Sequence, residues 1–330
     1  MADSIVFGAA GFIGGALVAR LLDEGRTVIA AVRPGSEPRV RIQHPELTVV
    51  AADITKPDLG LADSLDVQDV YNCAARFAFG LDSADARAVN VDGAVHVLEW
   101  AARLPALRRL VHVSGYRVSV PGHRPDYRAG AYEASKTEGD RVLWQRAGEL
   151  NVPVTVANPS AVLGPGQYIG LAEMVRDLWQ RKLPAIPGGR RTLVPIVELG
   201  YFAEFLARIP EYPETAGAAY TVLDPDSPAL PDLIRFLAAH LDVPAPRFTV
   251  PLGVLRRLPT VLTGVDREQL AFLSEDRYDT SAAEAFAERA GLVMPPVEEV
   301  LRAWADHLVD SGFGEEGTRM SSVVTKSRSS

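Results

Sequence analysis

The first fourteen residues constrain the fold more than any other stretch of the chain. A short apolar run at 5–7 has the β-branched and aromatic character of a strand and stops at Gly8, and a helical pattern begins near Phe12. Gly8 permits a tight turn between the two elements. Gly11 lets backbone N–H groups approach a pyrophosphate without a Cβ in the way, and Gly14 lets the helix pack close to the strand.

The head of this helix, at Phe12 and Ile13, presents unpaired N–H groups and the positive end of the helix dipole. The turn therefore predicts a dinucleotide phosphate site. The spacing is Gly-x-x-Gly-x-x-Gly, and an ordinary glycine-rich turn is the alternative. The position between a strand and a helix is the context that the phosphate-binding motif requires.

The next predicted strand, 27–32, ends at a basic residue that bears on the choice of cofactor. An acid at this place would hold the ribose hydroxyls of NAD, whereas an arginine would pair with the 2′-phosphate of NADP. The chain has Arg33 there and no acid before Glu37. We predict NADP(H), with NAD and a merely solvated Arg33 as the alternatives.

Two further predicted strands, 47–52 and 67–73, end in residues suited to a dinucleotide. The first end is placed to meet the adenine half, and the small residues at the second let the cofactor lie flat against the sheet. A helix at 84–103, which carries Asn90, and a strand at 110–113 follow. The predicted cofactor contacts at the two strand ends are Asp53, Ile54, Cys73, Ala74 and Ala75.

Strands that alternate with helices in this rhythm indicate βαβ units with parallel strands and right-handed crossovers. We therefore expect an α/β fold, a Rossmann-type doubly wound parallel sheet, followed by a smaller and mostly helical substrate lobe. The dinucleotide-binding domain is predicted at 1–158, with sheet segments returning near 192–225. The substrate lobe is predicted at 159–314 and a disordered tail at 315–330.

Tyr132 and Lys136 stand at the head of a predicted helix that continues to residue 149. They are one helical turn apart and so project from the same face. An ammonium a few ångströms from a phenol favours the phenolate, which suits a group that exchanges protons. The same spacing arises by chance on surface helices, but here it follows a dinucleotide turn and a fifth strand.

These motifs together resemble the extended branch of the short-chain dehydrogenase/reductase family, over roughly residues 3–225. Stretches such as 90–93, 111–114, 158–164 and 193–196 look like dihydroflavonol reductases and thioester or fatty-acyl reductase domains. The resemblance implies an NAD(P)-dependent enzyme of the epimerase/dehydratase type. It also implies that Asn90, Tyr132, Lys136, Pro159 and Ser160 join the cofactor contacts.

The same resemblance implies a Ser/Thr–Tyr–Lys triad in which the hydroxyl polarises the carbonyl, tyrosine exchanges the proton and lysine holds the nicotinamide ribose. When Val118 is aligned with the family's valine, Gly115 stands where the hydroxyl is expected and Ser114 falls one position early. On a strand such an offset turns a side chain to the opposite face. Three alternatives stay open. Ser114 supplies the catalytic hydroxyl, or Tyr116 or Ser119 supplies it instead, or the site works without this hydrogen-bond donor.

Composition excludes several other classes. A net charge of −8 argues against the excess of positive charge that nucleic-acid binding requires. No apolar run reaches the roughly 18 residues of a membrane span. The single cysteine, Cys73, and the absence of His-x-x-x-His argue against a metal site. We expect a cytoplasmic enzyme, with no nucleic-acid or membrane partner, that dimerises through its two long helices if it follows the family.

The leading hypothesis is an NADP(H)-dependent oxidoreductase that reduces a ketone or aldehyde, or oxidises the matching alcohol, of a moderately apolar small molecule. A nucleotide-sugar epimerase or dehydratase with retained NAD is the second reading, against which Arg33 argues. A non-catalytic regulator that senses a dinucleotide is the third. Gly115 favours it, and the intact Tyr132–Lys136 pair opposes it.

Overall fold

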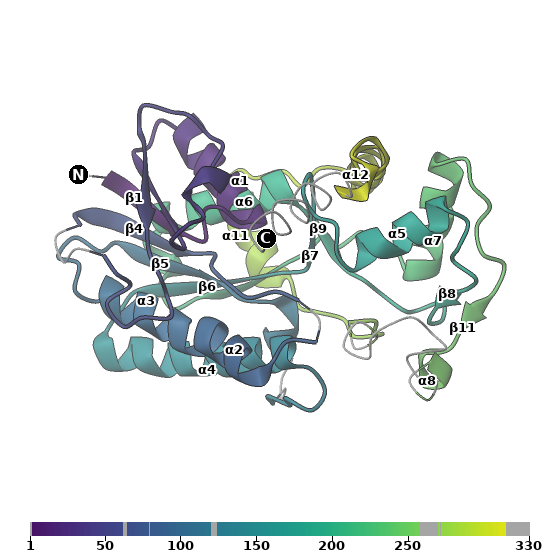
Figure 1. Ribbon diagram of the computed structural model, residues 1–330, viewed down its shortest axis with the longest axis horizontal. Helices are drawn as coiled ribbons and strands as arrows, with labels where there is room; N and C mark the ends of the chain where they lie inside the picture. The colour runs from purple at the N-terminus through teal and green to yellow at the C-terminus, as the bar shows by residue number, and fades with distance from the viewer. Residues whose placement is uncertain are drawn as a thin grey trace, which may run out of the picture. The chain divides into compact units, whose positions relative to one another are not determined.

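The computed structural model describes residues 2–61, 65–78, 80–119, 124–255, 257, 270 and 272–314, which form two compact units (Figure 1). Unit 1 comprises Met1–Ser160, Leu199–Leu223 and Arg277–Val293. Unit 2 comprises Ala161–Glu198, Asp224–Asp276 and the chain from Met294 onward.

Unit 1 is built on a seven-stranded sheet in the order β10-β6-β5-β4-β1-β2-β3, in which every pair of neighbours is parallel. The strand order reverses between β1 and β4, and such a switch point is where ligands of doubly wound sheets bind. The predicted Rossmann-type fold is confirmed. The strands are β1 (Ala2–Phe7), β2 (Val28–Val32), β3 (Leu47–Ala51), β4 (Val67–Asn72), β5 (Arg109–Val113), β6 (Val154–Pro159) and β10 (Ala219–Val222).

Helices cover both faces of this sheet. Figure 1 shows α2, α3 and α4 on one face and α1, α6 and α11 on the other. The inner strands are largely buried, as a sheet covered on both sides requires; β2 and β5, for example, are buried along their whole length, although β5 also carries Arg109 and His112. The helices are α1 (Phe12–Asp23), α2 (Ser83–Arg87), α3 (Gly93–Ala101), α4 (Ala131–Leu150), α6 (Leu199–Arg208) and α11 (Ser281–Arg289).

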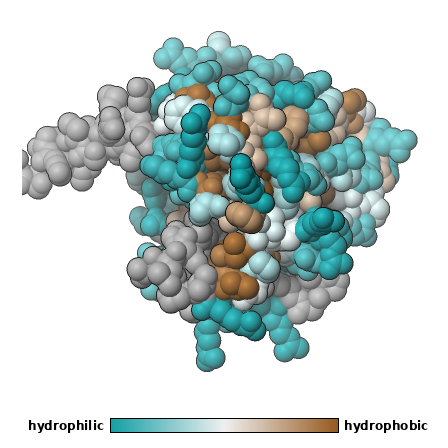
Figure 2. All heavy atoms as spheres, turned by 90° about the vertical axis from the view of Figure 1, so that its right-hand side faces the viewer, coloured by the Kyte–Doolittle hydropathy of each residue, from teal (hydrophilic) through white to brown (hydrophobic). Residues whose placement is uncertain are grey.

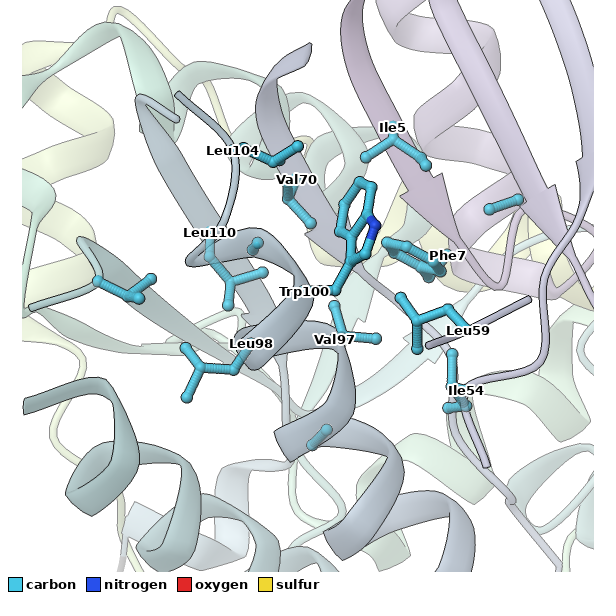
Figure 3. Close-up of a cluster of buried hydrophobic side chains, with 14 of the residues drawn as sticks. Ile5, Phe7, Ile54, Leu59, Val70, Val97, Leu98, Trp100, Leu104 and Leu110 are labelled. Carbon is cyan, nitrogen blue, oxygen red and sulfur yellow. The ribbon is translucent and has the colours of Figure 1, made fainter. Parts of the chain in front are cut away.

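The core beneath α3 and α4 is one cluster of buried apolar side chains from strands and helices (Figure 3). Trp100 of α3 lies against Phe7 of β1, with ring centroids 5.6 Å apart and an edge-on angle of 81°. Val97 and Leu98 of α3 and Leu110 of β5 are also buried there. This packing holds β1, β4 and β5 against α3 and α4.

The predicted helix at 84–103 is not continuous. α2 is followed by a π-helical segment, η2 (Ala88–Asp92), before α3 begins at Gly93. The strand β6 was not predicted at all. Most other boundaries agree with the sequence to within a few residues, and α1 begins at Phe12, where its helical pattern was expected.

The extent of the second lobe also differs from the sequence-based expectation. The stretch 277–293, predicted within the substrate lobe, belongs to unit 1. Its helix α11 places Phe286 on Tyr220 of β10, with ring centroids 5.2 Å apart, and on Phe205 of α6 at 4.9 Å. This aromatic cluster therefore holds the segment 277–293 against β10, the strand at the edge of the sheet.

Unit 2 has its own apolar core, formed mainly by three helices. They are α5 (Leu171–Trp179), α7 (Leu230–His240) and α12 (Val297–Asp310). Two short parallel pairs accompany them, between β7 (Ala161–Leu163) and β9 (Ile196–Glu198), and between β8 (Ile186–Pro187) and β11 (Thr249–Val250). A single turn, α8 (Leu252–Leu255), follows β11. The tail predicted at 315–330 lies outside the described residues.

Figure 2 turns the right-hand side of Figure 1 toward the reader, and hydrophilic residues are interspersed there with apolar ones. Exposed large apolar side chains of unit 2 include Trp179, Phe248 and Val254. Among the described residues, no helix has the length and apolar character needed to cross a membrane.

Candidate active site

The glycines of the first turn are required by its geometry. Gly8 has a φ of +79°, and a Cβ on it would lie 2.7 Å from the amide N of Ala74. A Cβ on Gly14 would lie 2.3 Å from the carbonyl O of Gly8. The turn after β1 therefore closes against the end of β4 and against its own helix, as the sequence predicts for Gly8 and Gly14.

The N-terminus of α1 is free for an anion. Its N-cap, Gly11, provides no side-chain cap, and the first turn of α1 contains no acidic residue. The N–H dipoles at Phe12 and Ile13 are therefore not neutralised within the helix. This open cradle fits the pyrophosphate of a dinucleotide.

The end of β4 forms the opposite wall of this cradle. The Asn72 side chain is buried and accepts a hydrogen bond from the N–H of Ala74 through Oδ1 at 3.2 Å, while the N–H of Cys73 donates to the carbonyl of Phe7. Burial raises the pKa of the Cys73 thiol to about 12. The Cys73 thiol is therefore neutral, and Ala75, two residues further on, is exposed. The predicted cofactor contacts of Cys73 and Ala75 stay predictions.

Asn90, on the π-helical segment, ties the loop after β4 to α4. Its Oδ1 accepts a hydrogen bond from the N–H of Arg76 at 2.8 Å, and its Nδ2 donates to the carbonyl of Arg76 and to Ser135 Oγ. Gly139 of α4 makes this approach possible, because a Cβ there would lie 2.3 Å from the carbonyl O of Asn90. The side-chain amide of Asn90 thus binds the loop after β4. Its predicted contact with the cofactor stays a prediction.

Arg33 and Asp53 follow the neighbouring strands β2 and β3. Arg33 is exposed. The Asp53 carboxylate accepts hydrogen bonds from Thr55 Oγ1 at 2.6 Å and from the Thr55 N–H at 3.1 Å. The Thr55 hydroxyl is the main cause of the lowered pKa of Asp53, and the charge of Arg33 adds to it. Ile54 is buried, and its carbonyl contacts His96 Nδ1 at 2.8 Å.

Tyr132 and Lys136 lie on the sheet-facing side of α4 near its N-terminus. Tyr132 is half-buried, and the ring of Phe77 packs edge-on against it with centroids 4.8 Å apart. Lys136 is 5% exposed, and its Nζ donates to the carbonyl of Val113, at the end of β5, at 3.0 Å. Burial lowers the pKa of Lys136 to about 8, and the charge of Asp140 opposes that shift.

Ser114 does not present its hydroxyl to solvent. Its Oγ is completely shielded and makes no hydrogen bond of regular geometry with the described residues, although it is near enough to lower the pKa of Asp140. Asp140 lies two turns beyond Tyr132 on α4, or about 12 Å along the helix axis. By contrast, a Cβ on Gly115 would meet no heavy atom within 4 Å in the described part of the chain.

Of the two alternative hydroxyls, the structure describes only that of Tyr116. Tyr116 is 6% exposed and packs against Tyr278, with ring centroids 4.9 Å apart. Burial raises its pKa. The side chain of Ser119 lies outside the described residues. Tyr278 reaches this place from the returning segment of unit 1, and no local sequence pattern indicates it.

The end of β6 adds further buried polar groups at the carboxyl edge of the sheet. Ser160 donates its N–H to the carbonyl of Val222, and Pro159 pairs with Val222 in the parallel ladder. Ser160 Oγ and Asn158 Oδ1 are buried without hydrogen-bond partners among the residues that the structure describes. Both predicted contacts, Pro159 and Ser160, therefore lie at the same edge as the glycine turn.

Sequence reasoning missed three residues of this site. Asp140 continues the four-residue spacing of Tyr132 and Lys136, and Ser135 donates its hydroxyl to the carbonyl of Tyr132 at 2.8 Å. Gly139 is the third. Only the spacing of Asp140 was visible in the sequence, because Ser135 and Gly139 owe their roles to the approach of the π-helical segment.

Comparison with known proteins agrees with this geometry. Residues 4–194 match the NAD dependent epimerase/dehydratase family. The chain belongs to this family and is an NAD(P)-dependent enzyme of the extended short-chain dehydrogenase/reductase type.

Among its relatives is a putative dihydroflavonol 4-reductase of Synechocystis, which is 26% identical over 330 residues covering 93% of this chain and 94% of that protein. Solved structures show the same fold. The terminal R domain of the myxalamid PKS-NRPS pathway has a TM-score of 0.77 at 20% identity, covering 94% of this chain and 92% of that one. The Bordetella bronchiseptica enzyme WbmF in complex with NAD+ has a TM-score of 0.74 at 17% identity, covering 98% and 97%.

Proposed function

We propose that the chain is an NADP(H)-dependent oxidoreductase that reduces a ketone or aldehyde of a moderately apolar small molecule, or oxidises the matching alcohol. The observation that carries this proposal is the burial of a lysine one helical turn from a half-buried tyrosine, at the end of β5. A bound nicotinamide supplies or accepts the hydride. Tyr132 gives the proton to the carbonyl oxygen, and the Lys136 ammonium favours the phenolate that results.

The preference for NADP(H) rests on Arg33. Its guanidinium is exposed after β2, where the adenosine ribose of a dinucleotide lies in this fold, and it can pair with a 2′-phosphate in a bidentate geometry. The carboxylate of Asp53 is already engaged by Thr55. Titration of the apoprotein with NADPH and with NADH tests this preference, which equal affinities would refute.

The apolar character of the substrate rests on Phe77. Its ring is 44% exposed although it packs against Tyr132. A solvent-exposed aromatic beside a proton donor favours an apolar or aromatic group next to the reacting carbonyl.

The first prediction concerns the proton donor. Tyr132→Phe removes the phenolic O–H, and we expect carbonyl reduction to slow by roughly 100- to 10,000-fold, the usual contribution of a general acid. NADPH oxidation with a panel of aldehydes, ketones and thioesters measures the rate. NADPH affinity should stay within about threefold of the parent protein, since the phenol is not needed for the phosphate cradle. A variant that retains full activity would refute the proposed role.

The rival functions have separate signatures. A nucleotide-sugar epimerase would hold NAD through desalting and release it on denaturation, and it would turn over a UDP-sugar without net oxidation of nucleotide. A regulator would bind the dinucleotide but reduce no member of the panel, and Tyr132→Phe would leave its cellular phenotype unchanged. The family dimer through α3 and α4 is also part of the proposal, and sedimentation equilibrium tests it.

A further inference from the structure

The sheet-facing side of α4 carries a third titratable residue, Asp140, besides Tyr132 and Lys136. Tyr132, Lys136 and Asp140 recur every four residues and so share one side of the helix. The Lys136 ammonium is buried and donates to a neutral carbonyl, that of Val113. A buried charge with only a neutral partner is costly and tends to lose its proton.

Asp140 supplies the opposite charge. Its Oδ1 is completely shielded, and it has no hydrogen-bond partner in the described part of the molecule. The hydroxyl of Ser114 is shielded in the same way. Burial raises the pKa of Asp140 to about 6, while the charge of Lys136 and the hydroxyl of Ser114 act to lower it. The charge of Asp140 in turn raises the pKa of Lys136 against the effect of burial.

The other titratable groups packed around Lys136 provide no counter-charge. Cys73 at the end of β4 and His112 of β5 are neutral, because burial raises the pKa of Cys73 to about 12 and lowers that of His112 to about 3. Several charged residues of α4 and of the segments that pack against it are held in other ion pairs, while Asp85 of α2 and Asp92 of the π-helical segment are exposed. These pairs are Arg87–Glu138, Arg146–Glu99 and Arg117–Glu133.

We propose that Asp140 is a positioning residue of this site, whose carboxylate keeps the buried Lys136 side chain cationic for the proton donor. This inference rests on the proposed function of Tyr132 and Lys136. The hydroxyl of Ser114 then supports the carboxylate of Asp140 and does not touch the substrate. Asp140 contacts neither substrate nor cofactor, and it acts through Lys136.

Three variants on the same helix test the proposal. Asp140→Asn removes the charge with little change of shape, Asp140→Glu keeps the charge, and Glu149→Gln removes an exposed charge at the far end of α4. Each is assayed for kcat of carbonyl reduction from pH 5.5 to 9.5. Activity needs protonated Lys136, so it falls as pH rises through the pKa of that residue, about 8.

Loss of the carboxylate lowers the pKa of Lys136, so the alkaline limb of Asp140→Asn should move down by about one pH unit. The Asp140→Glu limb should stay within about 0.3 unit of the parent, and that of Glu149→Gln should not move. An unchanged Asp140→Asn profile, or an equal shift in Glu149→Gln, would overturn the proposal.

A second readout needs no substrate. The ultraviolet difference spectrum between each protein and its Tyr132→Phe counterpart follows ionisation of the phenol alone. In Asp140→Asn the phenolate should form about one pH unit higher than in the parent, because the neighbouring ammonium is lost earlier. If no carbonyl is ever reduced but this shift appears, the proposed function fails and the role of Asp140 stands. If a carbonyl is reduced but the shift is absent, the proposed function stands and the role of Asp140 fails.

A measurement on the unmutated protein covers the case in which Asp140→Asn does not fold. Carbon-detected NMR of the Asp140 carboxyl should give a pKa near 6, above the ordinary 3.8. The charge of Lys136 acts to lower this pKa, so the pKa of Asp140 should be higher in Lys136→Met than in the unmutated protein. An equal pKa in the two proteins would mean that the two charges do not interact, and it would overturn the inference.

Discussion

At the scale of single residues, one position separates this chain from the usual triad. Gly115 occupies the place where the family resemblance implies a hydroxyl, and its hypothetical Cβ has no heavy atom within 4 Å in the described residues. Ser114, one residue earlier, is buried toward Asp140. A shift of one residue along a strand reverses the face to which a side chain points, which agrees with the shielded position of the Ser114 hydroxyl.

This leads to a gain-of-function prediction. Gly115→Ser adds a hydroxyl in open space, and we expect carbonyl reduction to speed up by about tenfold or more, part of the 100- to 1,000-fold effect of an oxyanion donor. Gly115→Ala adds the same Cβ without the hydroxyl and is the matched control, for which kcat should be unchanged. Equal rates in the two variants would show that no substrate oxygen lies beside this position.

At the scale of elements, the π-helical segment η2 packs closely against the helix α4. A π-helical turn shifts the helix register by one residue, and such turns occur often at functional sites. Here the segment carries Asn90, which holds the loop after β4 and reaches Ser135 of α4. The contact depends on the absence of a side chain at Gly139.

Two glycines of α4 give a matched pair for this contact. Gly139→Ala would place a Cβ 2.3 Å from a backbone oxygen, and we expect it to lower the free energy of unfolding by about 1–3 kcal/mol. Gly148→Ala meets no heavy atom within 4 Å among the described residues, and it should be neutral or stabilising by up to about 1 kcal/mol. Urea denaturation measures both. Similar values for the two variants would contradict the close approach.

At the scale of the whole molecule, burial of ionisable groups links stability to pH. His112 is 3% exposed in the middle of the sheet, and burial lowers its pKa to about 3 from 6.5. Below pH 6.5 the unfolded chain takes up a proton that the folded chain does not. The stability that the neutral ring provides is therefore complete above pH 6.5 and is lost as pH falls toward 3.

We expect His112→Leu to reduce this acid sensitivity. The stability of the parent relative to the variant should fall by about 1 kcal/mol per pH unit between pH 6 and 4. The raised pKa of Asp140 acts in the opposite direction in both proteins, so it cancels in the comparison. Urea denaturation at each pH gives the values, and the exposed His44→Gln is the control. A constant difference across this range would rule out a buried neutral His112.

The parts that the sequence determined are those whose physics is local. A glycine at positive φ, a strand that passes directly into a helix, and a tyrosine and lysine one turn apart each follow from a few neighbouring residues. These patterns were enough to predict the parallel sheet and to bring the first turn, the end of β4 and the head of α4 to one edge of it. The missed strand β6 shows the limit of the method, since its polar Thr155 and Asn158 hide an otherwise apolar run.

The tertiary structure alone decided which remote groups meet. Ser114 faces Asp140 and leaves Gly115 open, Asn90 reaches Ser135, and Tyr278 returns from the late segment of unit 1 to pack on Tyr116. None of these contacts has a sequence signature, because each depends on how segments far apart in the chain pack together. The cost of burying a charge is set by that packing, so the state of Lys136 is a property of the fold and not of its motif.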